Sequence, residues 1–327
     1  MAIAHQGKLV ALQGFGTFTY DTGSPAVTPA TIYDLASVTK VVATTAACMV
    51  LYEQGKFRLE QPVAEVLPEF AGYDARRAQV TFRMLLAHSS GLPAYARMFE
   101  GATSKNDIFE QAFQIPLSAD PGSRAEYSDV GFILLGEALE RLIGQSLDKF
   151  CKEQIFNPLG MATMTFKPAA NLKPLIPPTQ DDVTFRHEVV QGEVNDENAW
   201  AMGGVAGHAG CFSTAEDVAI FAECMLRGGA PLLQPHTVEL FTRHEEIPAG
   251  TSRALGWDTP SLPSQSGSLF SPRSYGHLGY TGTSLWLDPE RHLSVTLLTN
   301  RTWPDREAQS IKQIRPAFHD AVIEAIK

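Results

Sequence analysis

Alternating apolar and polar residues at the start of the chain predict strands. Two β-type runs, residues 2–5 and 9–19, flank the tripeptide Gln6-Gly7-Lys8. Because glycine permits the tight turn of a hairpin, this pattern predicts two antiparallel strands joined at Gly7. The chain is therefore expected to begin in a sheet.

Strand patterns return near the end of the chain. Residues 284–287 and 292–299 alternate or run apolar, and Asp288-Pro289-Glu290-Arg291 supplies a turn between them. Residues 216–227 and the amphipathic stretch 306–326 have the spacing of helices. These segments predict a sheet that is built from both ends of the chain and flanked by helices.

The middle of the chain has mostly helical patterns, over residues 82–87, 130–143 and 147–156, broken by proline and glycine. With 327 residues, the chain exceeds the roughly 250–300 at which a single core usually stops growing. We therefore expect a mixed α/β (α+β) fold with a central antiparallel sheet. It would form one catalytic domain, 1–327, with an α/β lobe from residues 1–60 plus 200–327 and an inserted, mostly helical lobe from residues 61–199.

The segment 38–54 is predicted to be a helix that ends at Gly55, a residue typical of a left-handed C-cap. Residues 41–52 carry no charge, which predicts burial on all sides. Ser37 and Lys40 would lie one turn apart on one face. Burial disfavours the charged form of lysine, so we expect a lowered pKa and a free amine able to take the proton of the Ser37 hydroxyl.

This Ser-x-x-Lys pattern is weak by itself, because Ser146-Leu147-Asp148-Lys149 matches it too. Ser146 is predicted instead to cap a helix, with Asp148 favourable in its first turn. Two further elements distinguish Ser37. Tyr127 can relay a proton if Lys40 lowers its pKa. The glycines around His277, including Gly279, would let the backbone approach a substrate and leave an N–H free for an oxyanion.

In their order and separation, these three elements resemble the penicillin-recognising serine hydrolases, namely class C β-lactamases, D-alanyl-D-alanine carboxypeptidases and related esterases. The resemblance implies a β-lactamase/transpeptidase-like fold. It also implies that Ser37 attacks, that Lys40 and Tyr127 handle its proton, and that the N–H groups of Ser37 and Tyr280 bind the oxyanion. Further runs resemble the family: Leu35-Ala36-Ser37, Leu85 to Pro93, Ile155 to Met161 and Gly203 to Gly210.

Two departures from the family pattern bear on the substrate. Asp129 stands where the family has an asparagine, so an amide donor is replaced by an acceptor. His277 stands where β-lactamases carry a lysine, and is expected to titrate near neutrality. Both changes favour a carboxylesterase or D-amino-acid peptidase over an efficient β-lactamase. A weak to moderate β-lactamase and a penicillin-binding sensor without turnover remain alternatives.

Other hydrolase chemistries have less support. No serine lies in the G-x-S-x-G turn of an α/β-hydrolase. A metal hydrolase would need ligand spacing such as H-E-x-x-H, which is missing. We expect no metal or cofactor, structural roles for His88 and His208, and four buried free cysteines. The acidic side chains of the middle segment, which with His187 and His208 could otherwise supply metal ligands, are interpreted as a solvated loop: Asp181, Asp182, Glu188, Asp196 and Glu197.

The charge and composition of the chain limit the kinds of molecule that it is expected to bind. The net charge is −10 and the basic residues are scattered, which argues against nucleic acid. The expected partner is a small molecule or peptide with an ester or amide carbonyl, and the oligomeric state stays open. No apolar stretch approaches the roughly 18–20 residues of a membrane span. The sequence as written has no signal peptide, which predicts a cytoplasmic location, or a periplasmic or extracellular one if the N-terminus is truncated.

Overall fold

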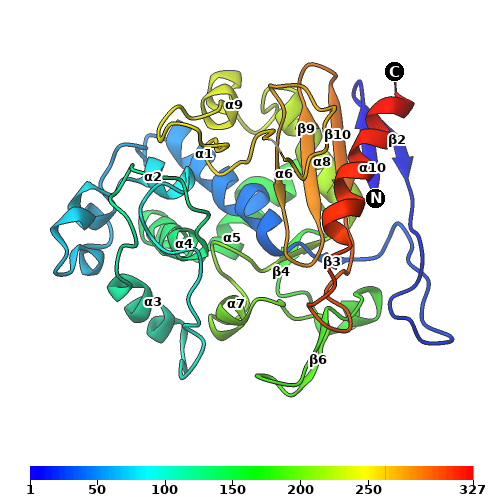
Figure 1. The fold of residues 1–327 in the computed structure, drawn as a ribbon, viewed down its shortest axis with the longest axis horizontal. Coiled ribbons are helices and arrows are strands. Elements are labelled where there is room, and N and C mark those ends of the chain that lie inside the picture. Colours follow the sequence, from blue (N-terminus) through cyan, green and yellow to red (C-terminus); the bar gives the residue numbers. More distant parts are fainter. Residues whose placement is uncertain (262, 327) are drawn as a thin grey trace.

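Five antiparallel strands from the two ends of the chain form the main sheet (Figure 1). The structure is a computed structural model that describes residues 1–261 and 263–326. The strand order β2-β1-β10-β9-β8 places the N-terminal hairpin beside the C-terminal strands, as the sequence predicted. The five strands are β1 (Ala2–His5), β2 (Lys8–Leu12), β8 (Tyr275–Leu278), β9 (Ser284–Asp288) and β10 (Leu293–Leu297).

The second N-terminal strand is shorter than predicted. It ends at Leu12, and residues 13–19 are irregular. Gly14 explains the departure, because a Cβ on this residue would lie 2.5 Å from the carbonyl oxygen of Val27. The chain therefore turns away from the sheet here to pack against residues further along.

Helices cover both faces of the main sheet (Figure 1). Alternate residues of β9 show the two faces: Leu285 and Leu287 join the large core that contains helix α8 (Ala215–Leu226), and Trp286 joins a smaller core under helix α10 (Ile311–Ala325). Helix α10 begins five residues later than predicted. Residues 306–310 form turns instead, and the Arg306 guanidinium donates to Gln180 Oε1 and Glu197 Oε1.

Shorter elements lie between the main-sheet segments. The predicted helices over 82–87, 130–143 and 147–156 are present with small shifts, the last ending in a π-helical turn at Lys152–Phe156. The segment 61–199 also contains strands, and its description as a separate lobe stays a prediction. The α-helices and strands that begin in this segment are α2 (Phe82–Leu86), α3 (Lys105–Gln114), α4 (Asp129–Ile143), α5 (Leu147–Cys151), α6 (Asn157–Leu159), β4 (Thr165–Phe166), β5 (Gln180–Asp182), β6 (Glu188–Val190) and α7 (Glu197–Ala201). Three further elements lie before or after it: β3 (Tyr33–Asp34), β7 (Cys211–Ser213) and α9 (Pro235–Thr242).

The helix after Ser37 changes its winding twice. It starts as a 3-10 turn at Ala36–Val38, continues as a π-helix at Lys40–Thr45 and becomes α-helix α1 (Ala46–Glu53). Gly55 follows with φ +67°, as expected of a C-cap glycine. Residues 41–51 are all buried, as their uncharged sequence predicted, and Tyr52 at the end of the uncharged stretch is half-buried. π-Helical turns of this kind are often found at functional sites.

Two glycines, Gly136 on α4 and Gly207 in the loop before β7, let that loop pack closely against α4. A Cβ on Gly207 would overlap the carbonyl oxygen of Phe132 and lie 2.9 Å from Gly136 on helix α4. The carbonyl oxygen of Gly207 accepts a hydrogen bond of 2.6 Å from Thr44 Oγ1. The loop before β7 is therefore held between α4 and the helix that carries Lys40.

We predict that Gly207→Ala lowers the free energy of unfolding by about 2–4 kcal/mol, because the backbone of α4 has no room for a methyl group. Chemical denaturation measures the change. Gly131→Ala is the matched control, since its Cβ would meet Leu85 and Ser128 only at 3.6 Å or more. Alanine favours a helix interior by about 1 kcal/mol over glycine, so this control should be neutral or stabilising. Equal losses in both variants would contradict the prediction.

Candidate active site

Ser37, Lys40 and Tyr127 meet at one point although they come from distant segments. The Ser37 Oγ accepts hydrogen bonds from Lys40 Nζ at 3.0 Å and from the Tyr127 hydroxyl at 2.7 Å. In a 3-10 turn, residues three apart are eclipsed, which brings the serine and lysine side chains to the same side. Tyr127 precedes helix α4, whose N-cap is Ser128. The structure thus brings together the three residues that the sequence predicted to act in catalysis.

The ammonium group of Lys40 is fully buried, and three oxygen atoms surround it. Besides Ser37 Oγ, it donates to Asp129 Oδ1 at 2.6 Å and to the carbonyl oxygen of His208 at 2.9 Å. An ammonium group has three N–H donors, so all three are used. Asp129 is predominantly buried as well, with its side chain 17% exposed.

The expectation that burial lowers the pKa of Lys40 is wrong. Burial does act in that direction, but the negative charge of Asp129 and the interaction with Tyr127 outweigh it, so the pKa is raised. Lys40 is therefore an ammonium ion at neutral pH in this structure. Asp129 accordingly binds the lysine side chain, a role that the sequence comparison with asparagine did not anticipate.

The expected lowering of the Tyr127 pKa is also wrong. Burial and the charge of Asp129 raise it to about 12, against the smaller opposing effects of Lys40 and of the hydrogen bond to Ser37. The tyrosine keeps its proton at neutral pH and acts as a hydrogen-bond donor. Two buried histidines pack near its ring, His88 at 4.7 Å and His277 at 6.0 Å between ring centroids.

A cavity of about 690 Å³ opens at Ser37. Beside Ser37, the cavity is lined by Tyr127, Asp129 and the turn of His277, Gly279 and Tyr280. The size suits a small molecule or the end of a peptide. The rest of the cavity is lined by the 195–197 segment, the 253–265 region, and the residues at and before the start of α10. The lining residues there include Tyr95, Asn195, Asp196, Glu197, Arg253, Asp258, Gln265, Arg301, Arg306, Gln309, Ile311, Lys312 and Arg315.

His277 does not titrate near neutrality as predicted. Burial, together with the nearby charges of Lys40 and Arg253, holds its pKa well below the usual value. Its Nδ1 lies 2.7 Å from the carbonyl oxygen of Leu278, so in the neutral ring this nitrogen donates and Nε2 keeps a lone pair. His277 therefore offers no positive charge to a substrate carboxylate at neutral pH.

Gly279 is required by packing against the protein itself. A Cβ there would overlap Thr283 Oγ1 and lie 2.6 Å from the carbonyl oxygen of Leu35. The Thr283 hydroxyl donates to that same carbonyl at 2.9 Å. The glycine was predicted to allow close approach of a substrate, and in the structure it allows close approach of the segment before Ser37. Tyr280 follows, 49% exposed, with the Arg301 guanidinium 4.3 Å from its ring centroid.

Several secondary expectations can be compared with the structure. Ser146 is the N-cap of α5, but its side chain makes no capping hydrogen bond. The solvated-loop interpretation is wrong for Asp182, which is buried and accepts the N–H of Phe185 at 3.0 Å, and for Asp196, which pairs with His208 at 2.7 Å. The four cysteines are buried free thiols. Among the described residues, no group of three or more His, Cys, Asp or Glu could hold a metal ion.

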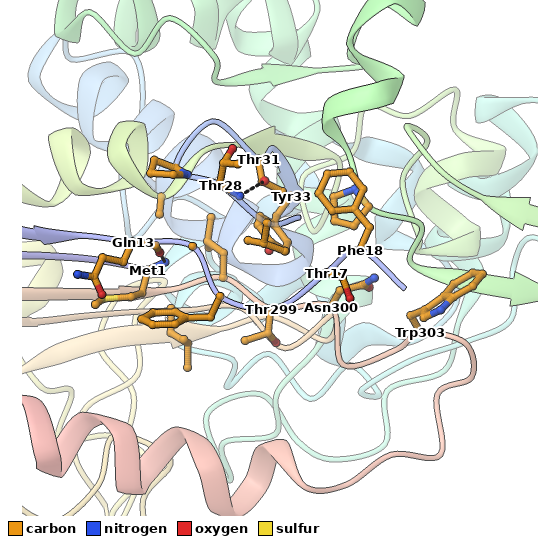
Figure 2. A pocket seen from close by; sticks show the side chains of 18 of the residues that line it. Met1, Gln13, Thr17, Phe18, Thr28, Thr31, Tyr33, Thr299, Asn300 and Trp303 are labelled. Carbon is orange, nitrogen blue, oxygen red and sulfur yellow. Dashed lines mark hydrogen bonds between the residues drawn. The ribbon is translucent and has the colours of Figure 1, made fainter. Parts of the chain in front are cut away.

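A second, smaller cavity of about 230 Å³ lies beside the N-terminus (Figure 2). Met1, Phe18, Tyr33 and Trp303 line it, and Thr28 N donates to Thr31 Oγ1 at 2.9 Å in its wall. None of the predicted site residues lines this cavity. The candidate active site is therefore the larger one.

The sequence analysis missed the basic residues of the cavity wall. Arg301, Arg306, Lys312 and Arg315 lie within 15 residues of one another, at and before the start of α10. For Arg306, Lys312 and Arg315, the pattern of residues 306–326 predicted only an amphipathic helix, and Arg301 lies outside that stretch. Whether these basic side chains line the cavity depends on how the C-terminal segment packs against the rest of the fold, and a local sequence pattern does not contain that information.

Known proteins resemble this chain along nearly all of its length. The family profile described as Beta-lactamase matches residues 1–316. The chain belongs to the beta-lactamase family. A relative from Escherichia coli (strain K12), named "Putative D-alanyl-D-alanine carboxypeptidase", is 36% identical over 305 residues, which is 84% of this chain and 70% of the relative. A relative of the same name from Salmonella enteritidis is 35% identical over 83% of this chain and 69% of its own.

Solved structures of other proteins share the fold of this chain. One is EstCE1, described as a hydrolase with promiscuous acyltransferase activity, with a TM-score of 0.77 and 22% identity over 97% of this chain and 92% of that chain. Another is the octameric penicillin-binding protein homologue from Pyrococcus abyssi, with a TM-score of 0.76 and 23% identity over 98% of this chain and 72% of that chain. At these identities the likeness shows the fold alone. In the part of the chain that the structure describes, no helix is long and apolar enough to cross a membrane.

The contact between Lys40 and Asp129 predicts how activity depends on pH. In Asp129→Asn, the charge that raises the Lys40 pKa is lost and burial lowers it, so the free amine forms at lower pH. The rise of acylation rate with pH should then move to lower pH by at least one unit, measured with a p-nitrophenyl ester. Asp258→Asn is the matched control, since this cavity residue faces Arg253 at 3.5 Å. An unchanged profile in Asp129→Asn would remove Lys40 from the role of base.

Proposed function

We propose that this protein hydrolyses ester or amide bonds through a covalent acyl-enzyme on Ser37. The observation that carries the proposal is the contact of Ser37 Oγ with Lys40 Nζ at 3.0 Å and with the Tyr127 hydroxyl at 2.7 Å, at the end of a cavity. A serine hydroxyl becomes a nucleophile only when an adjacent group takes its proton. Lys40 can receive that proton once it has lost one of its own, and Tyr127 can donate a proton to the leaving group.

In the proposed reaction, Lys40 in its amine form takes the Ser37 proton while Oγ bonds to the substrate carbonyl carbon. The negative charge moves to the carbonyl oxygen, which the backbone N–H groups of Ser37 and Tyr280 would bind. Ser37 is suited to this because it lies in the first turn of a 3-10 helix, where N–H groups have no acceptor within the helix. Tyr127 donates a proton to the leaving alcohol or amine, and the Lys40 ammonium group returns a proton to Tyr127. Water then attacks the ester of Ser37 while Lys40 takes its proton, and Lys40 passes that proton to Ser37 Oγ as the acid leaves.

We further propose a substrate that carries a carboxylate, as in a D-alanyl-D-alanine carboxypeptidase. The acidic residues that line the cavity have basic partners, for example Glu197 with Arg306 at 2.7 Å and Asp129 with Lys40. Arg301, Lys312 and Arg315 have no carboxylate within 4.0 Å among the described residues. A cavity with surplus positive charge in a chain of net charge −10 favours an anionic ligand. The names of the relatives agree with this chemistry.

The direct test is Ser37→Ala, assayed for release of D-alanine from a D-alanyl-D-alanine peptide and for hydrolysis of p-nitrophenyl acetate. Loss of the nucleophile should lower kcat by at least about 10³-fold. A fluorescent penicillin should label the wild-type protein and leave the variant unlabelled. Near-normal turnover by the variant would refute the proposal. Stable labelling of the wild type without turnover of any substrate would favour a sensor instead.

The substrate charge is tested by Lys312→Gln. Removing an exposed charge from the cavity wall should raise KM for the carboxylate-bearing peptide by about two- to fivefold, the range of a solvent-exposed ion pair. KM for p-nitrophenyl acetate, which is neutral, should not change. Lys56→Gln is the matched control, since Lys56 is exposed and lies outside the cavity. Equal effects on both substrates would show that the charge does not select a carboxylate.

A further inference from the structure

Asp34 links the segment of Ser37 to the opposite wall of the cavity. It is the last residue of strand β3 and is 2% exposed. Its Oδ1 accepts the backbone N–H of Ala36 at 2.8 Å, and its Oδ2 accepts the backbone N–H of Asn195 at 2.6 Å. Asn195 lines the cavity. One carboxylate therefore binds two segments that are 159 residues apart, which follows from their positions at 36 and 195.

The Ala36 contact holds an unfavourable backbone conformation. Ala36 has φ +46°, a region that residues with a side chain rarely adopt and that costs about 1 kcal/mol or more. Ser37 follows immediately, so the position of its Oγ and N–H depends on this turn. Asp34 Oδ1 satisfies the N–H of the strained residue and so supports the conformation.

Asp34 also joins the turn that carries Tyr280. Its carbonyl oxygen accepts a hydrogen bond of 2.9 Å from the Thr281 hydroxyl. The residue thus contacts the segments of both proposed oxyanion donors, Ser37 and Tyr280. A shift of Asp34 would change the distance between them.

The carboxylate has no direct basic partner in the described residues. Burial raises its pKa to about 6, against the hydrogen bonds from Asn195 and Ala36. The nearby charges are Asp196, which raises the pKa, and Arg186, which lowers it. Burial and, to a smaller extent, the charge of Asp34 raise the pKa of the Cys211 thiol on β7. Both oxygens already accept backbone N–H groups, and a proton added to either one removes the negative charge that strengthens these two hydrogen bonds.

We propose that Asp34 is a positioning residue whose ionised carboxylate holds the Ser37 turn and the Asn195 wall in the reactive arrangement, so that the enzyme loses activity when Asp34 is protonated. This inference rests on the proposed function of Ser37. The ionised fraction of Asp34 falls as the pH drops through about 6, so turnover should fall with the pH over the same range. A misplacement of about 1 Å can cost 10²-fold in rate.

The test compares wild type with Asp34→Asn, using p-nitrophenyl acetate between pH 5 and pH 8. At pH 7.5, the variant should have a kcat/KM about 10- to 100-fold lower, because its amide can accept only one of the two N–H groups. The ratio of wild-type to variant kcat/KM should fall toward one as the pH is lowered through about 6. Taking a ratio cancels the ionisation of Lys40, which both proteins share.

Two further variants separate positioning from stability. Asp217→Asn is the matched control, since Asp217 is buried and accepts the N–H of Met164 at 3.1 Å outside the cavity. The ratio of wild-type kcat/KM to that of Asp217→Asn should not depend on pH, even if the melting temperature of this variant falls. Asp34→Glu keeps an ionisable group and should lose activity while retaining the acid dependence. This variant tests the proposal if Asp34→Asn does not fold.

The outcomes distinguish this inference from the proposed function. If Ser37→Ala is inactive and Asp34→Asn matches wild type at every pH, the positioning role is wrong and the acyl-enzyme mechanism stands. A ratio that is large but constant with pH would also overturn the proposal, since it would indicate a structural role alone. Turnover by Ser37→Ala would refute the function on which the inference rests.

Discussion

The buried ammonium group of Lys40 is the constraint on which the site depends. Moving an unpaired charge into a protein interior costs several kcal/mol, so a lysine with no exposed surface must be surrounded by acceptors. The structure supplies Ser37, Asp129 and the carbonyl oxygen of His208. These three partners come from three segments, so helix α4, the loop before β7 and the helix after Ser37 must all be in place together. The close approach of Gly207 to α4 serves the same requirement.

The same ion pair explains where prediction from sequence succeeded and where it failed. Spacing placed Ser37 beside Lys40, and the uncharged stretch that follows predicted burial of the lysine. Both are local properties, which a single sequence reveals. The partner of Lys40 is Asp129, 89 residues away, and only the folded chain brings them together. Because that partner decides the sign of the Lys40 pKa shift, the shift was predicted in the wrong direction. For Tyr127, burial together with the charge of Asp129 reverses the predicted direction.

The fold, too, was predicted correctly where local patterns decide it and incorrectly where long-range contacts do. Alternating patterns predicted β1, β9 and β10 and their assembly from both chain ends, since strand periodicity is local. Residues 13–19 and 306–310 carry comparable patterns and form no strand or helix. In the first case Gly14 packs on Val27, and in the second Arg306 binds Gln180 and Glu197. Long-range contacts therefore override local preference at the segments that border the two cavities, including the basic wall of the active site.

The turn that carries Ser37 and the turn that carries Tyr280 are joined by hydrogen bonds. Thr281 donates to the carbonyl oxygen of Asp34, and Thr283 donates to that of Leu35, so the 279–283 turn is fixed to the two residues before Ala36. Arg315 supports the turn from α10, donating to the carbonyl oxygen of Thr283 at 3.1 Å. The relative position of the Ser37 and Tyr280 N–H groups is therefore set by hydrogen bonds within a few residues of each. Donors held in this way would stabilise the proposed oxyanion without reorganisation during the reaction, because the hydrogen bonds that fix both turns are already made in the free protein.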